Sequence, residues 1–107
     1  MAREQLKTLT EPMYYILLVL LEEQHGYGIM QKIAELTKGR VVIGAGTLYA
    51  LLSRFEKEGI IEQVREEERK KIYKLTYKGK ILLYEEEERL KKLLEDGMCY
   101  RKGLKNE

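Results

Sequence analysis

GTLYALLSRFEKEG, residues 46–59, is the stretch of this 107-residue chain with the clearest helical pattern. Its apolar side chains recur at the spacing i, i+3, i+4 and i+7 and therefore share one face of a helix; they are Leu48, Leu51, Leu52 and Phe55. Because Gly59 favours the end of a helix, we predict a helix over residues 47–58. The other face carries mostly polar groups, on Tyr49, Ala50, Ser53, Arg54 and Lys57.

A helix is also predicted near the N-terminus. Thr8 and Glu11 match the S/T-x-x-E capping box, and Pro12 follows in the first turn, where its missing N–H costs no hydrogen bond. We expect a helix to start there and to run to about residue 23. Residues 13–21 are almost all apolar, so this helix should lie at the centre of the core.

A second helix and a short strand are expected between these two segments. Apolar residues recur at helical spacing after Gly28, at Ile29, Ile33 and Leu36. Lys38 and Gly39 then stop the helix near residue 37. The β-branched triplet at residues 41–43 predicts a small strand, and residues 44–46 lead from it into the helix at 47–58.

A hairpin and a long last helix are predicted in the second half of the chain. Residues 60–65 and 70–75 form two extended stretches joined by the charged residues 66–69, and Tyr73 and Leu75 alternate with Lys74 as in a half-buried strand. Thr76 can cap a helix that runs to about residue 96. Three i,i+4 pairs support this helix: Glu85 with Arg89, Glu87 with Lys91, and Glu88 with Lys92.

The order of these elements is that of a winged helix-turn-helix. Such a unit projects one helix into the major groove of DNA while neighbouring elements bind phosphates. We therefore predict a mostly α fold, with a winged helix-turn-helix DNA-binding domain over residues 1–76 and a C-terminal dimerisation helix and tail over residues 77–107. No linker or internal repeat separates the two segments, so one compact domain is expected.

Composition excludes several classes of protein. With 20 Lys and Arg against 18 Asp and Glu, the net charge is only +2 and implies no partner by itself. Cys99 and His25 are the single cysteine and the single histidine, which leaves neither a disulfide framework nor the ligands of a zinc site. We expect no metal and no other cofactor. The apolar residues 13–21 fall short of the ~20 residues that a membrane span needs, so a cytoplasmic protein is expected.

An enzyme is not expected. Residues 41–46 read VVIGAG, but Tyr49 stands where a dinucleotide-binding fingerprint has its third glycine. His25 has no serine, cysteine or aspartate partner whose position suggests a nucleophile, and we expect it to be structural or exposed. Cys99 lies near the C-terminus and is expected to be an incidental thiol.

Three motifs lie in order along the chain. They are His25-Gly26-Tyr27-Gly28-Ile29, then Gly46-Thr47-Leu48-Tyr49 with Leu52, Arg54, Phe55, Glu58 and Gly59, and finally Tyr73-Lys74-Leu75-Thr76 with Gly79. Together, over about residues 6–94, they resemble the PadR-like family of transcriptional regulators. The resemblance implies a homodimer held by its first and last helices, and a DNA-binding repressor that a small, often aromatic, ligand releases. The single helix after the hairpin resembles the short branch of this family.

Nine residues are candidates for binding double-stranded DNA. The outer face of the helix at 47–58 offers hydrogen-bond donors and positive charge, with Thr47 and Ser53 as candidates for reading bases. The resemblance implies that the hydroxyls of Tyr27 and Tyr49 bind phosphates, and the helix N-terminus at Gly46 suits an anion. The full set is Tyr27, Gly46, Thr47, Tyr49, Ser53, Arg54, Lys57, Arg69 and Lys71.

The charges of the hairpin admit two interpretations. Its basic cluster comprises Arg69, Lys70, Lys71 and Lys74, of which we select Arg69 and Lys71 as phosphate contacts. The three glutamates at residues 66–68 lie across the turn and repel phosphate, so the tip itself is not expected to enter a groove. Alternatively, these glutamates pair with the basic cluster, and both sets are solvated surface charges.

The last helix has more apolar surface than a small winged core covers. Its stripe consists of Leu82, Leu83, Leu90, Leu93 and Leu94. The stripe either docks on the core of its own chain or joins a two-fold dimer in which the first and last helices of two chains pack together. We predict the dimer, with Tyr14, Leu17, Leu83, Leu90 and Leu94 at its interface. Because the chain has no tryptophan, a pocket for an aromatic ligand would have to use Tyr14, Tyr15 or Tyr84, or none of them.

Two other functions remain open from the sequence. A winged helix can bind a protein through its hairpin while its charges serve solubility, and such an interaction module lacks the steep loss of DNA affinity with salt that a regulator shows. A protein that binds or scavenges a small molecule binds it equally well with and without DNA. A ligand-released regulator instead couples the two sites reciprocally.

Overall fold

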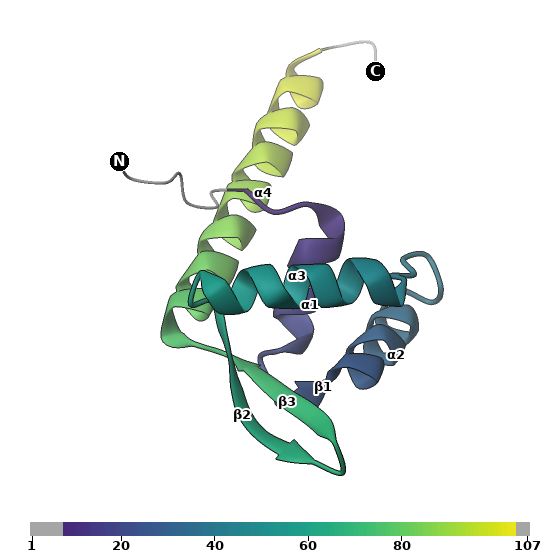
Figure 1. The fold of residues 1–107 in the computed structure, drawn as a ribbon. Coiled ribbons are helices and arrows are strands. Elements are labelled where there is room, and N and C mark those ends of the chain that lie inside the picture. Colours follow the sequence, from purple (N-terminus) through teal and green to yellow (C-terminus); the bar gives the residue numbers. More distant parts are fainter. Residues whose placement is uncertain (1–7, 105–107) are drawn as a thin grey trace.

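Four helices and three strands follow one another in the order of a winged helix-turn-helix, which confirms the predicted fold class (Figure 1). The computed structural model describes residues 8–104. Its elements are α1 (Glu11–Val19), β1 (Gln24–His25), α2 (Gly26–Leu36), α3 (Ala45–Lys57), β2 (Ile61–Glu67), β3 (Lys70–Leu75) and α4 (Tyr77–Gly103). Leu6, near which the family resemblance begins, and the outer ends of both predicted segments lie outside the described residues.

The core is built around α1, as the apolar run predicts. Ile16, Leu17 and Leu20 have no exposed surface and pack with buried residues of every other helix. The predicted stripe of α3 faces this core, with Leu48, Leu52 and Phe55 buried and Leu51 partly buried. Full burial of each leucine or isoleucine stabilises the fold by about 1.5–3 kcal/mol relative to exposure, so these side chains fix the position of α3.

The C-terminus of α3 is closed by a Schellman motif. The N–H of Gly59 donates to the carbonyl of Glu56 (3.1 Å), and the N–H of Ile60 donates to the carbonyl of Phe55 (2.9 Å). Gly59 has φ +75°, a left-handed conformation that glycine adopts without steric cost. The predicted end of α3 is therefore confirmed, with a backbone reason for the glycine.

The first turn of α4 is attached to the segment that follows α3. The backbone N–H of Thr76 donates to the carbonyl of Ile60 (3.0 Å), and the Thr76 hydroxyl lies 2.6 Å from the carbonyl oxygen of Gly59 and 3.0 Å from that of Ile60. The same hydroxyl accepts from the N–H of Gly79 (3.1 Å) and so caps the helix, as predicted. A Cβ on Gly79 would overlap the carbonyl oxygen of Ile60, which explains the glycine of this motif.

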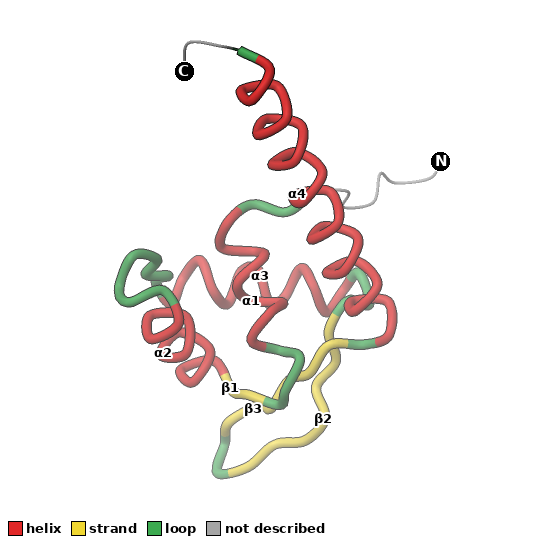
Figure 2. The backbone as a smooth tube through the Cα atoms, turned by 180° about the vertical axis from the view of Figure 1, so that it is seen from behind, coloured by secondary structure: helices red, strands yellow, loops and turns green. Residues whose placement is uncertain are grey.

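The sheet is antiparallel, with β3 between β1 and β2. β2 and β3 form the hairpin that we call the wing, in which Glu67 lies opposite Lys70. β1 adds two residues on the other side of β3, with Gln24 opposite Tyr73 and His25 opposite Ile72. Figure 2 shows the wing projecting from the helical body, at the opposite end of the molecule from the tip of α4.

The strand predicted at residues 41–43 is wrong. Val41 and Ile43 are buried and Val42 is exposed, as in a half-buried strand, yet within the described chain these residues belong to no sheet. The hydroxyl of Thr37 holds the segment instead, because it accepts from the N–H of Val41 (3.0 Å) and donates to the carbonyl of Ile33 (2.8 Å). The burial pattern of a strand is therefore present without a backbone partner.

Several predicted boundaries also differ from the structure. Thr10 rather than Thr8 caps α1, because its Oγ1 accepts from the N–H of Met13 (3.4 Å). α1 ends at Val19 instead of near residue 23, since the chain turns there to reach β1. α2 begins at Gly26, α3 at Ala45, β2 continues to Glu67, and α4 continues to Gly103 instead of ending near residue 96.

A buried carboxylate attaches α4 to the segment before α1. Only 2% of the Glu86 surface is exposed. Its carboxylate accepts two hydrogen bonds from the Arg89 guanidinium (2.8 and 2.7 Å) and one from the backbone N–H of Leu9 (3.3 Å). The bonds from Arg89, together with the weaker one from Leu9, hold the pKa of Glu86 below its ordinary value against the effect of burial. Arg89 thus pairs with Glu86, where the sequence predicts Glu85.

The second half of α4 extends beyond the rest of the molecule (Figures 1 and 2). All residues from 90 to 104 are exposed, whereas Leu83 on the first half is completely buried. Leu90, Leu93 and Leu94 are 42%, 55% and 62% exposed. Among residues 8–104, no helix combines the length and the apolar composition that crossing a membrane requires.

We expect Glu86→Gln to lower the free energy of unfolding by about 1–3 kcal/mol at neutral pH, because Arg89 loses its charged partner. The pKa of Glu86 is lower in the folded chain than in the unfolded one, so its contribution is present above the ordinary carboxyl range and is lost as the pH falls. Chemical denaturation at several pH values should therefore show the two proteins converging in acid. Glu88→Gln, at an exposed position on the same helix, is the control. A difference that stays constant into strong acid would contradict the role of the carboxylate.

Candidate nucleic-acid interface

All nine residues predicted to bind DNA have exposed side chains or backbone. Six of them lie on α3, which turns its outer face away from the core: Gly46, Thr47, Tyr49, Ser53, Arg54 and Lys57. The N-terminus of α3 follows Gly44, which supplies no side-chain cap, so the first N–H groups of this helix face outward. Such N–H groups and the helix dipole favour an anion at this end.

Arg54 is engaged within its own helix. Its Nε lies 3.0 Å from Oε2 of Glu58, an i,i+4 ion pair at the end of α3. The i,i+4 spacing of these two residues is typical of such a pair, but from the sequence Arg54 is predicted only as a DNA contact. The ion pair leaves the two terminal nitrogens of the guanidinium as the groups with which Arg54 could contact DNA.

The glycines of the motif at residues 25–29 make room for neighbouring side chains. Gly26 is buried under the ring of Tyr49, and a Cβ at this position would overlap the Tyr49 hydroxyl. A Cβ on Gly28 would overlap the side-chain amide of Gln24. The side chain of Tyr49 thus reaches from α3 to the N-terminus of α2. The motif supplies Gly26, whose missing side chain leaves the space that this ring occupies.

A cavity of about 390 Å³ lies where α2, α3 and the wing meet; we call it the wing cavity. It is lined by His25, Gly26, Tyr27, Tyr49, Arg69, Lys70, Lys71 and Tyr73. The structure therefore brings together four of the predicted DNA-binding residues, Tyr27, Tyr49, Arg69 and Lys71. The other five lie on α3 and do not line this cavity.

Four of the lining residues are not among the predicted DNA contacts: His25, Gly26, Lys70 and Tyr73. Lys70 belongs to the predicted basic cluster, and His25, Gly26 and Tyr73 belong to the motifs given above, so a signal exists for all four. Tyr73 is buried in β3, and burial, followed by the charge of Glu56, raises the pKa of its hydroxyl. Its hydroxyl therefore remains a hydrogen-bond donor at neutral pH.

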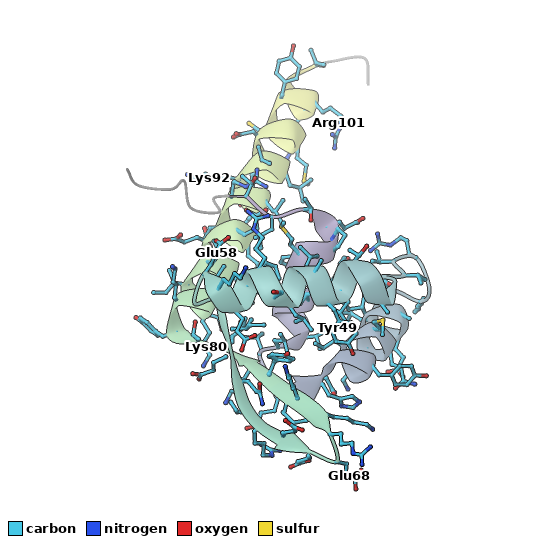
Figure 3. All side chains as sticks on the ribbon, in the orientation of Figure 1. Tyr49, Glu58, Glu68, Lys80, Lys92 and Arg101 are labelled. Carbon is cyan, nitrogen blue, oxygen red and sulfur yellow. The ribbon has the colours of Figure 1, made fainter. Side chains whose placement is uncertain are left out.

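One acidic residue of the wing, Glu67, is held by an arginine. Arg65 on β2 pairs with Glu67 on the same strand and with Glu23 before β1 (2.6 Å). Lys70 and Lys71 lie opposite Glu67 and Glu66 in the ladder, and both lysines line the wing cavity. Figure 3 shows Glu68 at the far tip of the wing, and Tyr49 on the side of α3 that faces α2. The cavity lining thus includes both lysines but none of the glutamates that lie opposite them on β2.

The five residues predicted at the dimer interface differ in how far they are exposed. Leu17 and Leu83 have no exposed surface and belong to the core of their own chain, so their assignment to an intersubunit contact is corrected. Tyr14 is half-buried, and its hydroxyl donates to Oε2 of Glu87 on α4 (2.8 Å). Burial and then this carboxylate raise the pKa of Tyr14 to about 12. Leu90 and Leu94 are exposed.

Two of the three tyrosines considered for an aromatic ligand lie together. The rings of Tyr14 and Tyr15 pack edge to face, with their centroids 5.4 Å apart. They border a cavity of about 330 Å³, which we call the α1–α4 cavity, lined by Leu9, Thr10, Glu11, Tyr14, Tyr15, Glu86 and Leu90. Tyr84 does not line it.

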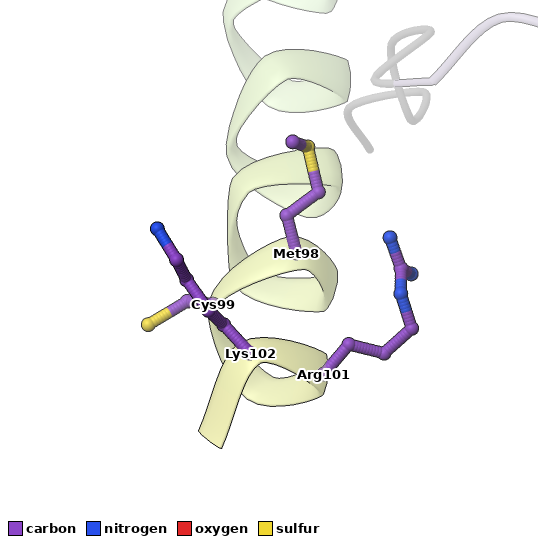
Figure 4. Close-up of a pocket in the computed structure, with 4 residues that line it drawn as sticks. All are labelled: Met98, Cys99, Arg101 and Lys102. Carbon is purple, nitrogen blue, oxygen red and sulfur yellow. The ribbon is translucent and has the colours of Figure 1, made fainter. Parts of the chain in front are cut away.

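The exposed end of α4 encloses no site. Figure 4 shows Met98, Cys99, Arg101 and Lys102 projecting from the last turns of this one helix. Cys99 is a free thiol, as predicted. Within residues 8–104, no three His, Cys, Asp or Glu side chains are grouped closely enough to hold a metal ion.

We expect Gly26→Ala to destabilise the protein by about 1–3 kcal/mol, because the added methyl group collides with the ring of Tyr49. In a Tyr49→Ala background the collision is removed and the same change should cost little. Chemical denaturation of the four proteins of this double-mutant cycle measures the coupling. In a Tyr27→Ala background the full cost should persist, and equal costs in all backgrounds would show that Tyr49 does not occupy the space above Gly26.

Comparison with known proteins identifies the family. The model of the transcriptional regulator PadR-like family matches residues 16–85. An uncharacterized protein of Lysinibacillus sphaericus is 36% identical over 72 residues, which are 64% of this chain and 66% of that protein. The chain thus spans just under two thirds of the length of this relative.

Solved structures with the same fold include three bacterial regulators. A PadR-like transcriptional regulator from Bacillus cereus has 26% identity and a TM-score of 0.68, covering 85% of this chain and 91% of its own. A PadR family transcriptional regulator from Eggerthella lenta has 27% identity and a TM-score of 0.68, with 86% and 81% covered. A transcriptional regulator from Clostridium thermocellum has 28% identity and a TM-score of 0.64, with 86% and 91% covered. The family consists of transcriptional regulators and not of enzymes, and this chain belongs to the PadR-like family of transcriptional regulators.

Proposed function

We propose that this transcriptional regulator is a homodimeric repressor that binds double-stranded DNA in a sequence-specific way. The observation that carries the proposal is the wing cavity, in which three cations and three tyrosines lie beside the exposed face of α3. Cations and hydroxyls bind phosphates, and an exposed helix next to them can enter the major groove. The role places the protein beside DNA, in the cytoplasm.

In the proposed complex α3 is the recognition helix. Its short polar side chains, Thr47 and Ser53, contact the edges of bases, because hydroxyls can donate and accept there. Tyr27, Tyr49, Arg69 and Lys71 bind phosphates around the wing cavity, and the N-terminus of α3 at Gly46 binds another. The last two predicted contacts, Arg54 and Lys57, lie at the C-terminal end of the same face, where positive charge meets the backbone.

In the proposed dimer the exposed half of α4 packs against a second copy of the chain. Leu90, Leu93, Gly97, Tyr100 and Leu104 follow one another at alternating spacings of three and four residues, the pattern of a helix that packs along a partner helix. Tyr14 and Leu94 border the same side. We therefore propose residues 1–76 as the DNA-binding segment and residues 77–107 as the dimerisation segment. Two copies then reach half-sites about 34 Å apart.

A small ligand that releases the protein from DNA is part of the proposal. The α1–α4 cavity is bordered by Tyr14 and Tyr15, which can stack on an aromatic compound, and by Leu90 of the proposed dimer contact. A ligand bound there would change how α4 meets its partner and so the spacing of the two recognition helices. Such a ligand weakens DNA binding only if it binds better to the DNA-free arrangement.

We expect Lys71→Ala to weaken binding to every DNA sequence, because it removes a phosphate contact, and to reduce the slope of log affinity against log salt by about one. Thr47→Ala should instead alter the preference among operator variants. Fluorescence anisotropy with upstream and random duplexes at several salt concentrations measures both effects. Lys92→Gln, on exposed α4, is the control for loss of a cation. Salt-independent or absent binding would favour a winged-helix protein-interaction module instead.

We expect Leu94→Glu to convert the dimer into a folded monomer, because a carboxylate cannot be buried unpaired between two helices. Light scattering gives the mass, and circular dichroism shows whether the chain remains helical. Lys92→Gln makes the same change of charge two residues away, on the opposite face of α4, and should remain dimeric. Monomeric wild-type protein, or a dimer unaffected by Leu94→Glu, would disprove this interface.

A further inference from the structure

The ion pair at the C-terminal end of α3 joins an exposed arginine to a carboxylate that is almost buried. Nε of Arg54 lies 3.0 Å from Oε2 of Glu58, and the two side chains are 49% and 9% exposed. In the proposed complex Arg54 and Lys57 share one role, as cations that meet the DNA backbone. The contact with Glu58 restricts the orientation of Arg54, however, and general attraction to phosphates does not require such a restriction.

Glu58 is itself held in place by two elements. Its N–H donates to the carbonyl of Arg54 (3.0 Å), and its own carbonyl accepts from Nζ of Lys78 on α4 (2.9 Å). Figure 3 shows Glu58 at the end of α3 that lies next to α4. Because both the backbone and the side chain of Glu58 are anchored, its carboxylate can fix the direction of the guanidinium before DNA binds.

The pair determines which groups of Arg54 are left for DNA. A guanidinium has five N–H groups in one plane, and the bond from Nε leaves the fork of its two terminal nitrogens. This fork matches O6 and N7 of guanine in the major groove. Glu58 also offsets the positive charge, which weakens the attraction to a phosphate but leaves hydrogen bonding to uncharged base acceptors. Arg54 lies two turns after Thr47 on the same side of α3, so both can face one groove.

We propose that Arg54 reads a guanine in the major groove and that Glu58 is its positioning residue. The inference rests on the proposed function, in which α3 is the recognition helix. It names one element of the sequence to which the protein binds, a G·C pair opposite the C-terminal half of α3. A bidentate arginine discriminates guanine from another base by about 5- to 150-fold.

Selection from a pool of randomised duplexes compares wild type with Arg54→Ala. The wild type should select guanine at one position of each half-site, and Arg54→Ala should lose this preference while it keeps the others. Replacement of that guanine by 7-deazaguanine, which lacks the N7 acceptor, should weaken binding by the wild type and cause no further loss in Arg54→Ala. The modified duplex tests the contact with unaltered protein, and circular dichroism shows whether Arg54→Ala is folded.

Glu58→Gln tests the positioning role, because the amide keeps the shape of the side chain and removes its charge. Its preference for guanine should lie between those of wild type and Arg54→Ala. Its affinity for a random duplex should rise, since the charge of Arg54 is no longer offset. Glu56→Gln is the matched control: it removes a carboxylate from an exposed position of the same helix. It should also raise the affinity for a random duplex, but without changing the preference for guanine.

The outcomes separate this inference from the proposed function. Equal weakening of Arg54→Ala on every duplex, or a wild-type affinity that 7-deazaguanine leaves unchanged, overturns the reading of guanine and leaves the proposed function standing. A preference for guanine in Glu58→Gln equal to that of the wild type overturns the positioning role. Wild-type protein that binds all duplexes equally, or binds none, overturns the proposed sequence-specific function and this inference with it.

Discussion

The carbonyl group of Ile60 is the point at which α3, the wing and α4 are held together. It accepts from the N–H of Thr76 (3.0 Å), and Gly79 packs directly against it. The Thr76 hydroxyl lies between this carbonyl oxygen and that of Gly59, at 3.0 and 2.6 Å. Ile60 also completes the cap of α3 and precedes β2, while Thr76 follows β3 and caps α4. Each hydrogen bond contributes only about 1 kcal/mol. The greater consequence is geometric, because the ends of four elements meet at one peptide group.

This junction ties the proposed dimer contact to the proposed DNA contact. One residue separates β3 from α4, and three residues separate α3 from β2, so no long loop separates α4 from the wing or from α3. Lys78 adds a further link, because its Nζ donates to the carbonyl of Glu58 at the end of α3 (2.9 Å). A rotation of α4 against a partner is therefore expected to move the recognition helix with it. The α1–α4 cavity lies on the helix that this movement involves.

How much of the fold can be predicted from the sequence depends on how far apart the interacting residues lie. The caps at Gly59 and Thr76 depend on neighbours within four residues, and the sequence predicts both. The strand assignment fails because a strand needs a distant partner: residues 41–43 have the burial pattern, but β3 pairs with Gln24 and His25, two polar residues with no pattern of their own. Leu17 and Leu83 fail as dimer contacts for a related reason. Periodicity indicates which side chains are buried but not against which chain.

In the candidate site, too, the sequence indicates single residues but not the contacts between residues that are far apart in the chain. Tyr27, Tyr49, Arg69 and Lys71 can be selected one at a time from motif and charge, and the structure places all four around one cavity. The position of the Tyr49 ring above Gly26 joins residues 23 positions apart and has no signal in spacing.

The pairing of acidic residues explains how a chain with a net charge of +2 can present a cationic cavity. On the wing, Arg65 holds both Glu23 and Glu67. On α4, Glu86 is neutralised by Arg89 and Glu87 accepts from Tyr14. None of these carboxylates lines the cavity, where Arg69, Lys70 and Lys71 meet α2 and α3. Attraction of a polyanion depends on this local excess of positive charge and not on the sum over the chain. For the same reason, a change that frees Glu67 from Arg65 should reduce the positive potential at the cavity without removing a single cation from it.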